Sequence, residues 1–399
     1  MGIKTLLISP VPTHPMDAGN RIRIFQLSEK LRASRCDLYF AYYDHEMAGG
    51  DYREMRRYWG KKAIFFSRKT PKTLFRFKRV FDCRKSQDIN VEKGPMEIDI
   101  WNNPAFDDVL LKLHSEVHFQ MVWVEYVFLS GILNCFDPSV IKVIDTHDVF
   151  SDRDKLFQAN NVDPEWFYTN REMEKQGLSR ADLVVAIKDA DAQFFRRMGL
   201  PNVVTIGHLF PPTLRRNGGT KENVCLFMGS DNTSNVKAWQ FFTDFVLDKI
   251  LERVPHVSFH IVGRICNRIP DRPSYKKFGV IPDLDKIYRS AKVAINPVTF
   301  GTGLKIKSIE PLAFGCPVVT TPVGIQGIED AENRGVLVGR TPEEFASHLE
   351  TLLENSYVYE RQREHGLRYM KRYQVLNQKR LEKILSKAGK KQGGRKDGK

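Results

Sequence analysis

One short segment combines glycines, lysines and a carboxylate between two apolar runs that indicate buried strands. It consists of residues 301–310, with the sequence GTGLKIKSIE. Glycines let a backbone approach a ligand closely, and the N–H groups at a helix N-terminus attract anions. We therefore expect this loop-to-helix junction to bind a diphosphate through Lys305 and Lys307, with Glu310 accepting hydrogen bonds from a hydroxylated group. An ordinary strand-to-helix turn with solvated lysines is the alternative interpretation.

A second group of polar side chains, Asp145-Thr146-His147-Asp148, ends another apolar run. In open parallel sheets, side chains at the carboxyl ends of strands face the ligand. We expect His147 and Asp148 to orient an acceptor or to hydrogen-bond a donor sugar, although an isolated histidine is more often structural. Glu125 is another strand-end carboxylate with the same two interpretations.

The elements that would position these residues are apolar runs that alternate with amphipathic segments. Most of the runs are continuous and β-branched or aromatic, as is typical of strands buried on both faces of a parallel sheet. Strands alternating with helices predict right-handed βαβ units and a doubly wound α/β fold. One of the helices begins near Ile306 and ends at Gly315, and another begins after Thr341. The predicted strands are Lys4–Ser9, Asp37–Tyr43, Ala63–Phe66, Met121–Tyr126, Val140–Asp145, Leu183–Ile187, Val203–Ile206, Val224–Met228, Ser258–Val262, Lys277–Val280, Val293–Asn296, Pro317–Thr320 and Val336–Val338.

Two complete strand series lie on either side of a segment that contains proline and glycine. We expect a Rossmann-like domain over 1–207, a linker over 208–223, a second Rossmann-like domain with terminal helices over 224–386, and a basic disordered tail over 387–399. Ligands of such sheets bind at the carboxyl ends of the strands. The predicted fold is therefore two tandem doubly wound parallel-sheet domains that face each other across a cleft.

The composition restricts the partners of this chain. Its net charge of +14 favours nucleic acid, an anionic membrane surface or a polyanionic substrate. No apolar run approaches the ~18 to 20 residues that a membrane span needs. The N-terminus lacks the pattern of a signal peptide, and the six cysteines form no C-x2-C pair. We therefore expect a cytoplasmic protein with reduced thiols.

Part of the positive charge is concentrated in a basic and aromatic stretch, residues 61–85. Its lysines and arginines are interleaved with phenylalanines. A basic helix with aromatic residues on another face would bind peripherally to an anionic bilayer. The alternative is an ordinary helix with its phenylalanines in the core. We expect no nucleic acid partner, because no recognised nucleic-acid module accompanies the stretch.

The run from Gly303 to Gly327, GLKIKSIEPLAFGCPVVTTPVGIQG, resembles the donor-site signature of group 1 (family 4) glycosyltransferases. In that family a G-x-x-x-K-x-x-E-A-x-A-x-G-x-P-V-V pattern binds a nucleotide diphospho-sugar on the glycosyltransferase B fold. The resemblance covers nearly the whole chain and is most specific over residues 224–327. It implies that Glu310 holds the ribose hydroxyls and that Lys307 neutralises the diphosphate.

The resemblance also assigns further residues. It implies that the backbone at Val280 and Ile281 reads the base, that Gly19 lies in a flexible loop near the diphosphate and acceptor, and that His147 is the histidine of the cleft. The substrate-binding set is Gly19, Gly229, Ser230, Asn235, Gly263, Arg264, Val280, Ile281, Thr302, Gly303, Lys305, Lys307 and Glu310, and the catalytic set is His147, Asp148 and Lys307.

Two positions depart from the family pattern. Thr302 stands eight residues before Glu310, where many members have a glutamate that contacts the transferred sugar. Ser230 and Asn235 occupy positions where many members have an arginine and a lysine. Neutralisation of the phosphates therefore depends on Lys305, Lys307, Arg264 and the helix dipole.

These features predict a glycosyltransferase that moves a sugar from a nucleotide diphospho-sugar to a hydroxyl of a glycan or lipid-linked acceptor. The resemblance implies a retaining, hexosyltransferase-type enzyme of polysaccharide biosynthesis. It also implies no metal and no cofactor beyond the nucleotide diphospho-sugar as co-substrate. Two alternatives remain: a sugar-nucleotide epimerase on the same fold, and a non-catalytic nucleotide-sugar-binding protein, which Thr302 favours.

Overall fold

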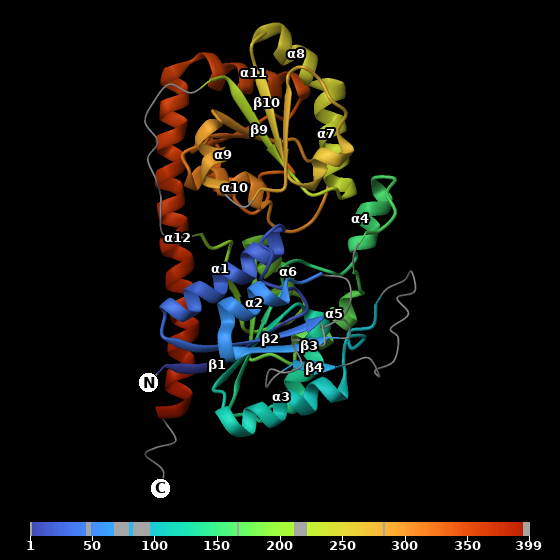
Figure 1. Cartoon of the computed structure of the whole chain (residues 1–399), viewed down its shortest axis with the longest axis vertical. Helices are drawn as coiled ribbons and strands as arrows, with labels where there is room; N and C mark the ends of the chain where they lie inside the picture. Colours follow the sequence, from blue (N-terminus) through green and yellow to red (C-terminus); the bar gives the residue numbers. More distant parts are fainter. Residues whose placement is uncertain are drawn as a thin grey trace. The chain divides into compact units, whose positions relative to one another are not determined.

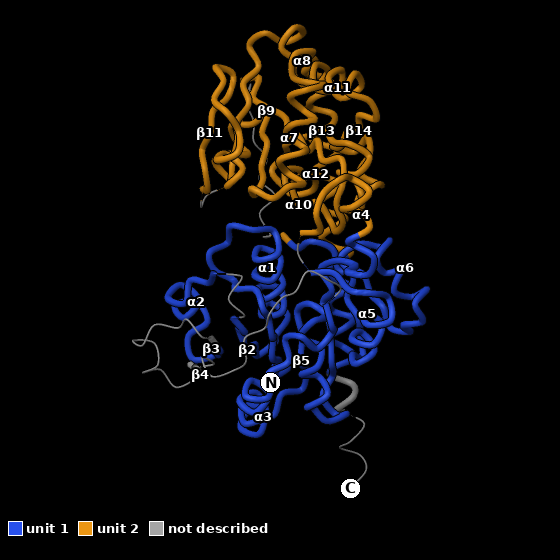
Figure 2. Tube along the Cα trace, turned by 90° about the vertical axis from the view of Figure 1, so that its right-hand side faces the viewer, with its two compact units in different colours: residues 1–154, 166–209, 377–399 blue, residues 155–165, 210–376 orange. Residues whose placement is uncertain are grey.

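The chain folds into two compact units, shown in different colours in Figure 2. The computed structural model describes residues 2–44, 49–67, 80–82, 96–165, 167–210, 222–281 and 284–393. Unit 1 comprises residues 1–154, 166–209 and 377–399, and unit 2 comprises residues 155–165 and 210–376.

Unit 1 contains an eight-stranded sheet in which every strand pairing is parallel (Figure 1). The strand order is β4-β3-β2-β1-β5-β6-β7-β8, so the order reverses between β1 and β5. The strands are β1 (Ile3–Ser9), β2 (Cys36–Asp44), β3 (Ala63–Ser67), β4 (Val80–Asp82), β5 (Met121–Glu125), β6 (Ile141–Asp145), β7 (Leu183–Ala186) and β8 (Val203–Thr205).

Both faces of this sheet are buried, which explains the continuous apolar runs of its strands. Leu6 and Ile8 of β1 lie in one core cluster, whereas Leu7 lies in the other. Successive side chains of a strand point to opposite faces, so a strand buried on both sides needs apolar residues at every position. The helical segments that accompany the sheet are α1 (Gly19–Ala33), α2 (Tyr52–Trp59), η1 (Gly60–Lys62), α3 (Pro104–Val117), η3 (Val127–Cys135), α4 (Arg153–Ala159), α5 (Arg171–Leu178) and α6 (Asp189–Arg197), with α4 extending into unit 2.

Unit 2 contains a six-stranded parallel sheet with the order β11-β10-β9-β12-β13-β14. This is the doubly wound order of a Rossmann fold, with its reversal between β9 and β12. The strands are β9 (Val224–Met228), β10 (Ser258–Val262), β11 (Tyr275–Gly279), β12 (Val293–Asn296), β13 (Val318–Thr320) and β14 (Val336–Val338). The helical segments are α7 (Thr233–Phe245), α8 (Leu247–Arg253), η4 (Arg264–Arg268), α9 (Leu284–Ser290), α10 (Ile306–Ala313), η5 (Glu329–Ala331), α11 (Pro342–Glu354) and the first part of α12 (Ser356–Gly393).

The predicted fold class is confirmed, because both units are doubly wound parallel-sheet domains. Each predicted strand has a counterpart in the structure, and among the strands of the described residues only the short β4 was not predicted. The predicted helix starts are also present. α10 begins at Ile306, and the Thr341 side chain caps α11 by accepting from the Glu344 N–H.

The last helix, α12, joins the two units in sequence. Its first part belongs to unit 2, whereas residues 377–393 belong to unit 1. There Leu381, Ile384 and Leu385 are buried in the core, and Asn377 accepts a hydrogen bond of 2.8 Å from the Gly207 N–H. The amphipathic pattern of a helix predicts that one face is buried. It does not indicate which domain core that face packs against.

The division into units differs from the predicted boundaries in three places. Residues 155–165 group with unit 2, and residues 377–386 group with unit 1. Residues 387–393 are helical, so the tail that we expect to be disordered from Lys387 onward begins with helix. Residues 394–399 and most of the predicted linker lie outside the described residues.

The basic and aromatic stretch is not the predicted basic helix in its described parts, which are the end of the 3-10 helix η1 and two strands. Ala63–Ser67 form β3, and Val80–Asp82 form β4. Phe65 and Phe66 are buried in the core and cannot contact a bilayer. Residues 68–79 and 83–85 lie outside the described residues. Among the helices that the structure describes, none has the length and apolarity required to cross a membrane.

Candidate functional site

The predicted loop and helix lie at the point where the strand order of unit 2 reverses. β9 leads into the segment from Gly229 to Asn235, and β12 leads into the loop before α10. Because β9 and β12 are parallel neighbours, both segments leave the same edge of the sheet. Doubly wound sheets bind their ligands at the carboxyl edge of this crevice.

Lys305 shapes the glycine loop instead of standing free at its surface. Its Nζ donates to the carbonyls of Gly301, Thr302 and Gly303 at 3.2, 2.8 and 3.0 Å. Gly301 and Gly303 have φ values of 130° and 74°, which non-glycine residues rarely adopt. Lys305 therefore positions the loop. The role predicted from the sequence was a different one, the direct neutralisation of phosphate.

The helix that follows leaves its N-terminus open. The N-cap residue of α10 is Lys305, whose side chain makes no cap hydrogen bond. At the other end the N–H groups of Gly315 and Cys316 donate to the carbonyls of Leu312 and Pro311. This is a Schellman motif with Gly315 at its left-handed position. It confirms the helix end that was predicted at Gly315. The N-terminus of α10 therefore keeps the positive end of the helix dipole and first-turn N–H groups that its N-cap side chain does not satisfy.

Lys307 is held by neutral partners. Its Nζ donates to the Asn235 Oδ1 and lies 5.1 Å from the centroid of the Phe227 ring. The Asn235 amide also donates to the carbonyl and hydroxyl oxygens of Ser230, at 3.0 and 3.1 Å. Burial and the charge of Lys305 lower the pKa of Lys307 to about 7. Among the described residues no carboxylate pairs with Lys307, so a bound anion would supply its first full counter-charge.

Glu310 lies one turn deeper on α10 and is oriented by a tyrosine. Its Oε2 accepts a hydrogen bond of 2.8 Å from the hydroxyl of Tyr288 on α9. Tyr288 is fully buried and stacks on Phe314 at a centroid distance of 4.6 Å. Burial raises the pKa of Glu310 to about 7, although the Tyr288 hydrogen bond opposes that shift. Sequence reasoning missed Tyr288, because the contact joins two helices and no local motif marks it.

Two glycines at the carboxyl ends of β9 and β10 permit a close backbone approach. Gly263 has a φ of 101°, and a β-carbon there would lie 2.2 Å from the Gly229 carbonyl oxygen. A β-carbon on Gly229 would lie 3.1 Å from the Asn235 side chain. Arg264 already pairs with Asp231 at 3.2 Å on the surface. A phosphate would have to compete with Asp231 for it, although exposed ion pairs are weak.

The predicted base loop follows β11. Val280 is exposed over 54% of its surface, which is uncommon for a valine, and Ile281 is partly buried. An exposed apolar side chain beside the loop is compatible with packing on a nucleobase. Pro282 and Asp283, which complete the loop, lie outside the described residues. Thr302 contributes a carbonyl to Lys305 and places no charge in the glycine loop.

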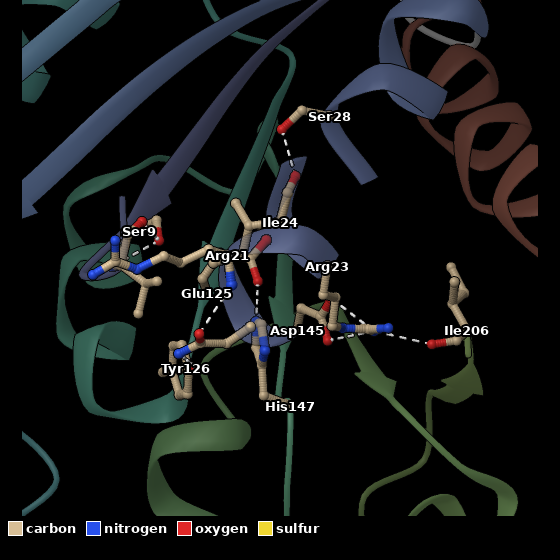
Figure 3. A network of polar contacts seen from close by, with 12 residues as sticks. Ser9, Arg21, Arg23, Ile24, Ser28, Glu125, Tyr126, Asp145, His147 and Ile206 are labelled. Atoms are coloured by element: carbon tan, nitrogen blue, oxygen red, sulfur yellow. Dashed lines mark hydrogen bonds and ion pairs between the residues drawn. The ribbon is translucent and has the colours of Figure 1, made fainter. Parts of the chain in front are cut away.

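In unit 1 the strand-end carboxylates form one network (Figure 3). Glu125 and Asp145 are register partners at the ends of β5 and β6. The Glu125 Oε2 lies 2.5 Å from the His147 Nε2. Arg23 from α1 donates to both oxygens of Asp145 at 2.9 Å and also to two backbone carbonyls.

Arg23 is therefore a structural residue. Its side chain is only 3% exposed and is held in a buried ion pair. A side chain buried in this way is neither available to a phosphate nor part of a solvated face. Arg21 pairs with Asp17 at 3.1 Å.

Three side chains of the network around Glu125 could together hold a metal ion. One ligand atom from each of Glu125, Asp145 and His147 lies within 4.8 Å of the others. Arg23 already neutralises Asp145, and the His147 Nε2 and the Glu125 Oε2 already form a hydrogen bond with each other. A zinc ion held about 2.1 Å from each atom would push the nitrogen and oxygen further apart. The chemistry of the cluster thus favours a proton-linked network.

The other predicted residues of unit 1 have local roles in the structure. Asp148 accepts from the Val149 N–H at 2.9 Å and lies 3.6 Å from Arg153. Gly19 is the first residue of α1, whereas the resemblance implied a flexible loop there. The structure therefore brings Lys307, Asn235 and Ser230 together in unit 2, and His147 and Glu125 together in unit 1.

The comparisons with known proteins agree with this arrangement. Residues 222–355 match the family model of glycosyl transferases group 1, which confirms the predicted resemblance in unit 2. No curated protein matches the chain in sequence. Similar solved structures include sucrose-phosphate synthase from Thermosynechococcus elongatus, with a TM-score of 0.66, 13% identity, and coverage of 96% of this chain and 98% of that one.

Two further structures are similar to the same extent. Anabaena HepE in complex with UDP has a TM-score of 0.66 and 13% identity, and the alignment covers 96% of this chain and 100% of HepE. The pneumococcal O-GlcNAc transferase GtfA in complex with UDP and GlcNAc has a TM-score of 0.66 and 11% identity, with coverage of 97% and 99%. At these identities the likeness shows the fold, which is the predicted glycosyltransferase B fold, and the family match supports a glycosyltransferase.

Proposed function

We propose that this chain is a glycosyltransferase whose unit 2 binds a nucleotide diphospho-sugar and whose unit 1 binds the hydroxyl-bearing acceptor. The observation that carries the proposal is the pair of oriented groups on α10. Lys307 lacks an acidic partner within the described residues, and Glu310 is oriented by Tyr288. A lysine held only by neutral partners and an oriented carboxylate one turn away match a diphosphate next to a ribose.

The mechanism would be mainly electrostatic. As the bond between the sugar C1 and the phosphate oxygen breaks, its electron pair moves to the diphosphate, and negative charge develops there. Lys307 and the open N-terminus of α10 would stabilise that charge more strongly in the transition state than in the bound donor. The acceptor oxygen forms the new bond to C1, and its proton passes to the leaving phosphate.

Lys305 and Tyr288 would act by positioning. Lys305 fixes three carbonyls of the glycine loop, and Tyr288 fixes the carboxylate of Glu310. Holding these groups in place before the ligand arrives reduces the reorganisation that binding requires. Retention of the anomeric configuration, transfer of a hexose and independence of metal complete the proposal. Turnover that survives a chelator such as EDTA would support the last of these.

The nucleotide should be identified by the stabilisation that it confers on the folded protein. HepE and GtfA were solved with UDP, so UDP and UDP-sugars are the first members of a panel of nucleotide diphospho-sugars. A ligand at 100 times its Kd stabilises the native state by about 2.7 kcal/mol, which raises Tm by several degrees. One nucleotide should raise Tm in wild type and should raise it less in Lys307→Met. A panel without any such nucleotide would contradict the proposed donor site.

The acceptor and its setting form the remaining part of the proposal. A lipid-linked acceptor, in polysaccharide biosynthesis on the cytoplasmic face of a membrane, would suit the basic residues of the stretch 61–85. Co-sedimentation with vesicles that contain anionic lipid tests this, and vesicles of neutral lipid are the control. Equal binding to both kinds of vesicle, or to neither, would remove the electrostatic argument for a membrane surface.

A further inference from the structure

We propose that Glu125 is a positioning residue for His147, fixing the imidazole in the tautomer whose Nδ1 accepts a hydrogen bond from a substrate hydroxyl. The inference rests on the proposed function for the identity of the substrate. The tautomer itself can be measured without turnover.

The imidazole of His147 is held on two sides. Its Nε2 is 2.5 Å from the Glu125 Oε2, and its ring stacks on Tyr126 at a centroid distance of 4.2 Å and an interplanar angle of 6°. The hydroxyl of Tyr126 accepts a hydrogen bond of 3.0 Å from Asn20, the second residue of α1. The ring therefore has one orientation, set by groups on three elements.

The backbone supports the same geometry at some cost. Tyr126 and His147 have φ values of 69° and 61°, in the left-handed region that bulky residues rarely adopt. Such conformations are strained and persist where surrounding structure enforces them. Tyr126 directly follows β5 and His147 lies two residues after the end of β6, so both lie at the carboxyl edge of the sheet.

The hydrogen bonds determine where the imidazole proton lies. A carboxylate can only accept, so an ionised Glu125 requires the proton of a neutral His147 on Nε2. Nδ1 then carries a lone pair, and among the described residues it has no hydrogen-bond partner. His147 is 8% exposed, so this lone pair is available to a ligand hydroxyl at the surface of the network.

The groups packed around Glu125 have opposing effects on its charge. Glu125 on β5 is fully buried and has Asp145 on β6 as its acidic neighbour, and both effects raise the pKa of Glu125. The hydrogen bond with His147 and the charge of Arg23 on α1 oppose that shift. A spectrum recorded above neutral pH therefore favours the ionised carboxylate, which is the form that accepts from Nε2.

The direct test is a nitrogen NMR spectrum of the full chain labelled with [15N]histidine, recorded at pH 8. The ten histidines give separate patterns, and that of His147 is identified by its absence in His147→Gln. We expect His147 to show a protonated Nε2 and an unprotonated Nδ1. In Glu125→Leu, which removes the acceptor, we expect a mixture of tautomers and a kcat/KM lowered tenfold to a hundredfold, about the value of one hydrogen bond to a charged group. The Kd for the nucleoside diphosphate that unit 2 binds should not change.

Two further variants separate positioning from folding. Glu125→Gln keeps an amide oxygen that can accept from Nε2, so it should retain the tautomer and recover part of the activity. Asp44→Asn removes the charge of another buried strand-end carboxylate, which accepts from Tyr52, and should leave the His147 spectrum unchanged.

Three results would overturn the inference. They are a wild-type His147 with its proton on Nδ1, a doubly protonated His147 at pH 8, and a Glu125→Leu spectrum identical to wild type. If Glu125→Leu does not fold, the wild-type and Glu125→Gln spectra still decide the tautomer. A protein with the expected tautomer and no sugar transfer would contradict only the proposed function.

Discussion

Replacing Lys307 with methionine is expected to lower kcat/KM for donor turnover by about 10²- to 10³-fold, the range measured when one charge-stabilising group is removed from an active site. The side chain has similar length, so the change removes the charge with little change in packing. Asn235 loses the donor to its Oδ1 and keeps its two contacts with Ser230. The loss should appear mainly in kcat, because the negative charge grows as the diphosphate leaves.

The matched control is Lys249→Met. Lys249 is a surface lysine of unit 2 on α8, and its ion pair with Glu343 is exposed. The control loses the same charge from the same unit and should turn over like wild type. Near-normal turnover of Lys307→Met would show that the diphosphate lies elsewhere, and equal losses in both variants would indicate a general effect of net charge.

The second large effect is expected at Glu310. Glu310→Gln keeps an oxygen that can accept from Tyr288 but exchanges charge-assisted hydrogen bonds to the ribose for neutral ones. Two such exchanges weaken binding by about 2–3 kcal/mol, or roughly 30- to 150-fold in Kd. Isothermal titration with the nucleoside diphosphate identified in the thermal panel measures this directly.

A ligand that lacks the ribose hydroxyls turns this measurement into a double-mutant cycle. The 2′,3′-dideoxy nucleotide should bind wild type more weakly than the full nucleotide does, and Glu310→Gln should distinguish the two ligands less than wild type does. Strict additivity of the two losses would mean that Glu310 does not contact the ribose.

The pH dependence of binding should separate the two groups, because their linkage has opposite signs. A bound diphosphate raises the pKa of Lys307 above its free value of about 7, so binding takes up a proton and weakens as pH rises. Ribose hydroxyls lower the pKa of Glu310 below its free value of about 7, so binding releases a proton and strengthens as pH rises. Affinity should therefore fall with pH in Glu310→Gln and rise with pH, up to about pH 8, in Lys307→Met.

The fold was predictable because a strand that is buried on both faces can be recognised from its own sequence. A strand buried on both faces, such as β1 with Leu6, Leu7 and Ile8, must be apolar throughout, and that pattern is visible without tertiary information. The loop and helix at 301–310 were predictable for a similar reason, since glycines at positive φ and a terminal glycine mark their own conformations.

The different roles of neighbouring side chains were not predictable from the sequence. Lys305 and Lys307 are two residues apart at the start of one helix, and only the structure shows that one binds the loop and the other faces Asn235. Arg23 and Tyr288 contact residues far away in sequence. Contacts of this kind depend on packing between elements, and no local pattern encodes them. The same holds for α12, whose last turns return to unit 1.

The central claim is that this chain transfers a sugar from a nucleotide diphospho-sugar to a hydroxyl, and one measurement tests it most directly. The nucleotide sugar selected by the thermal panel is incubated with wild type and a panel of glycan and lipid-linked alcohols, and NMR follows both the nucleoside diphosphate and the sugar. We expect acceptor-dependent release of the nucleoside diphosphate together with a new glycoside of unchanged anomeric configuration. Conversion of the sugar to an epimer without any acceptor, or tight binding with neither product, would contradict the claim.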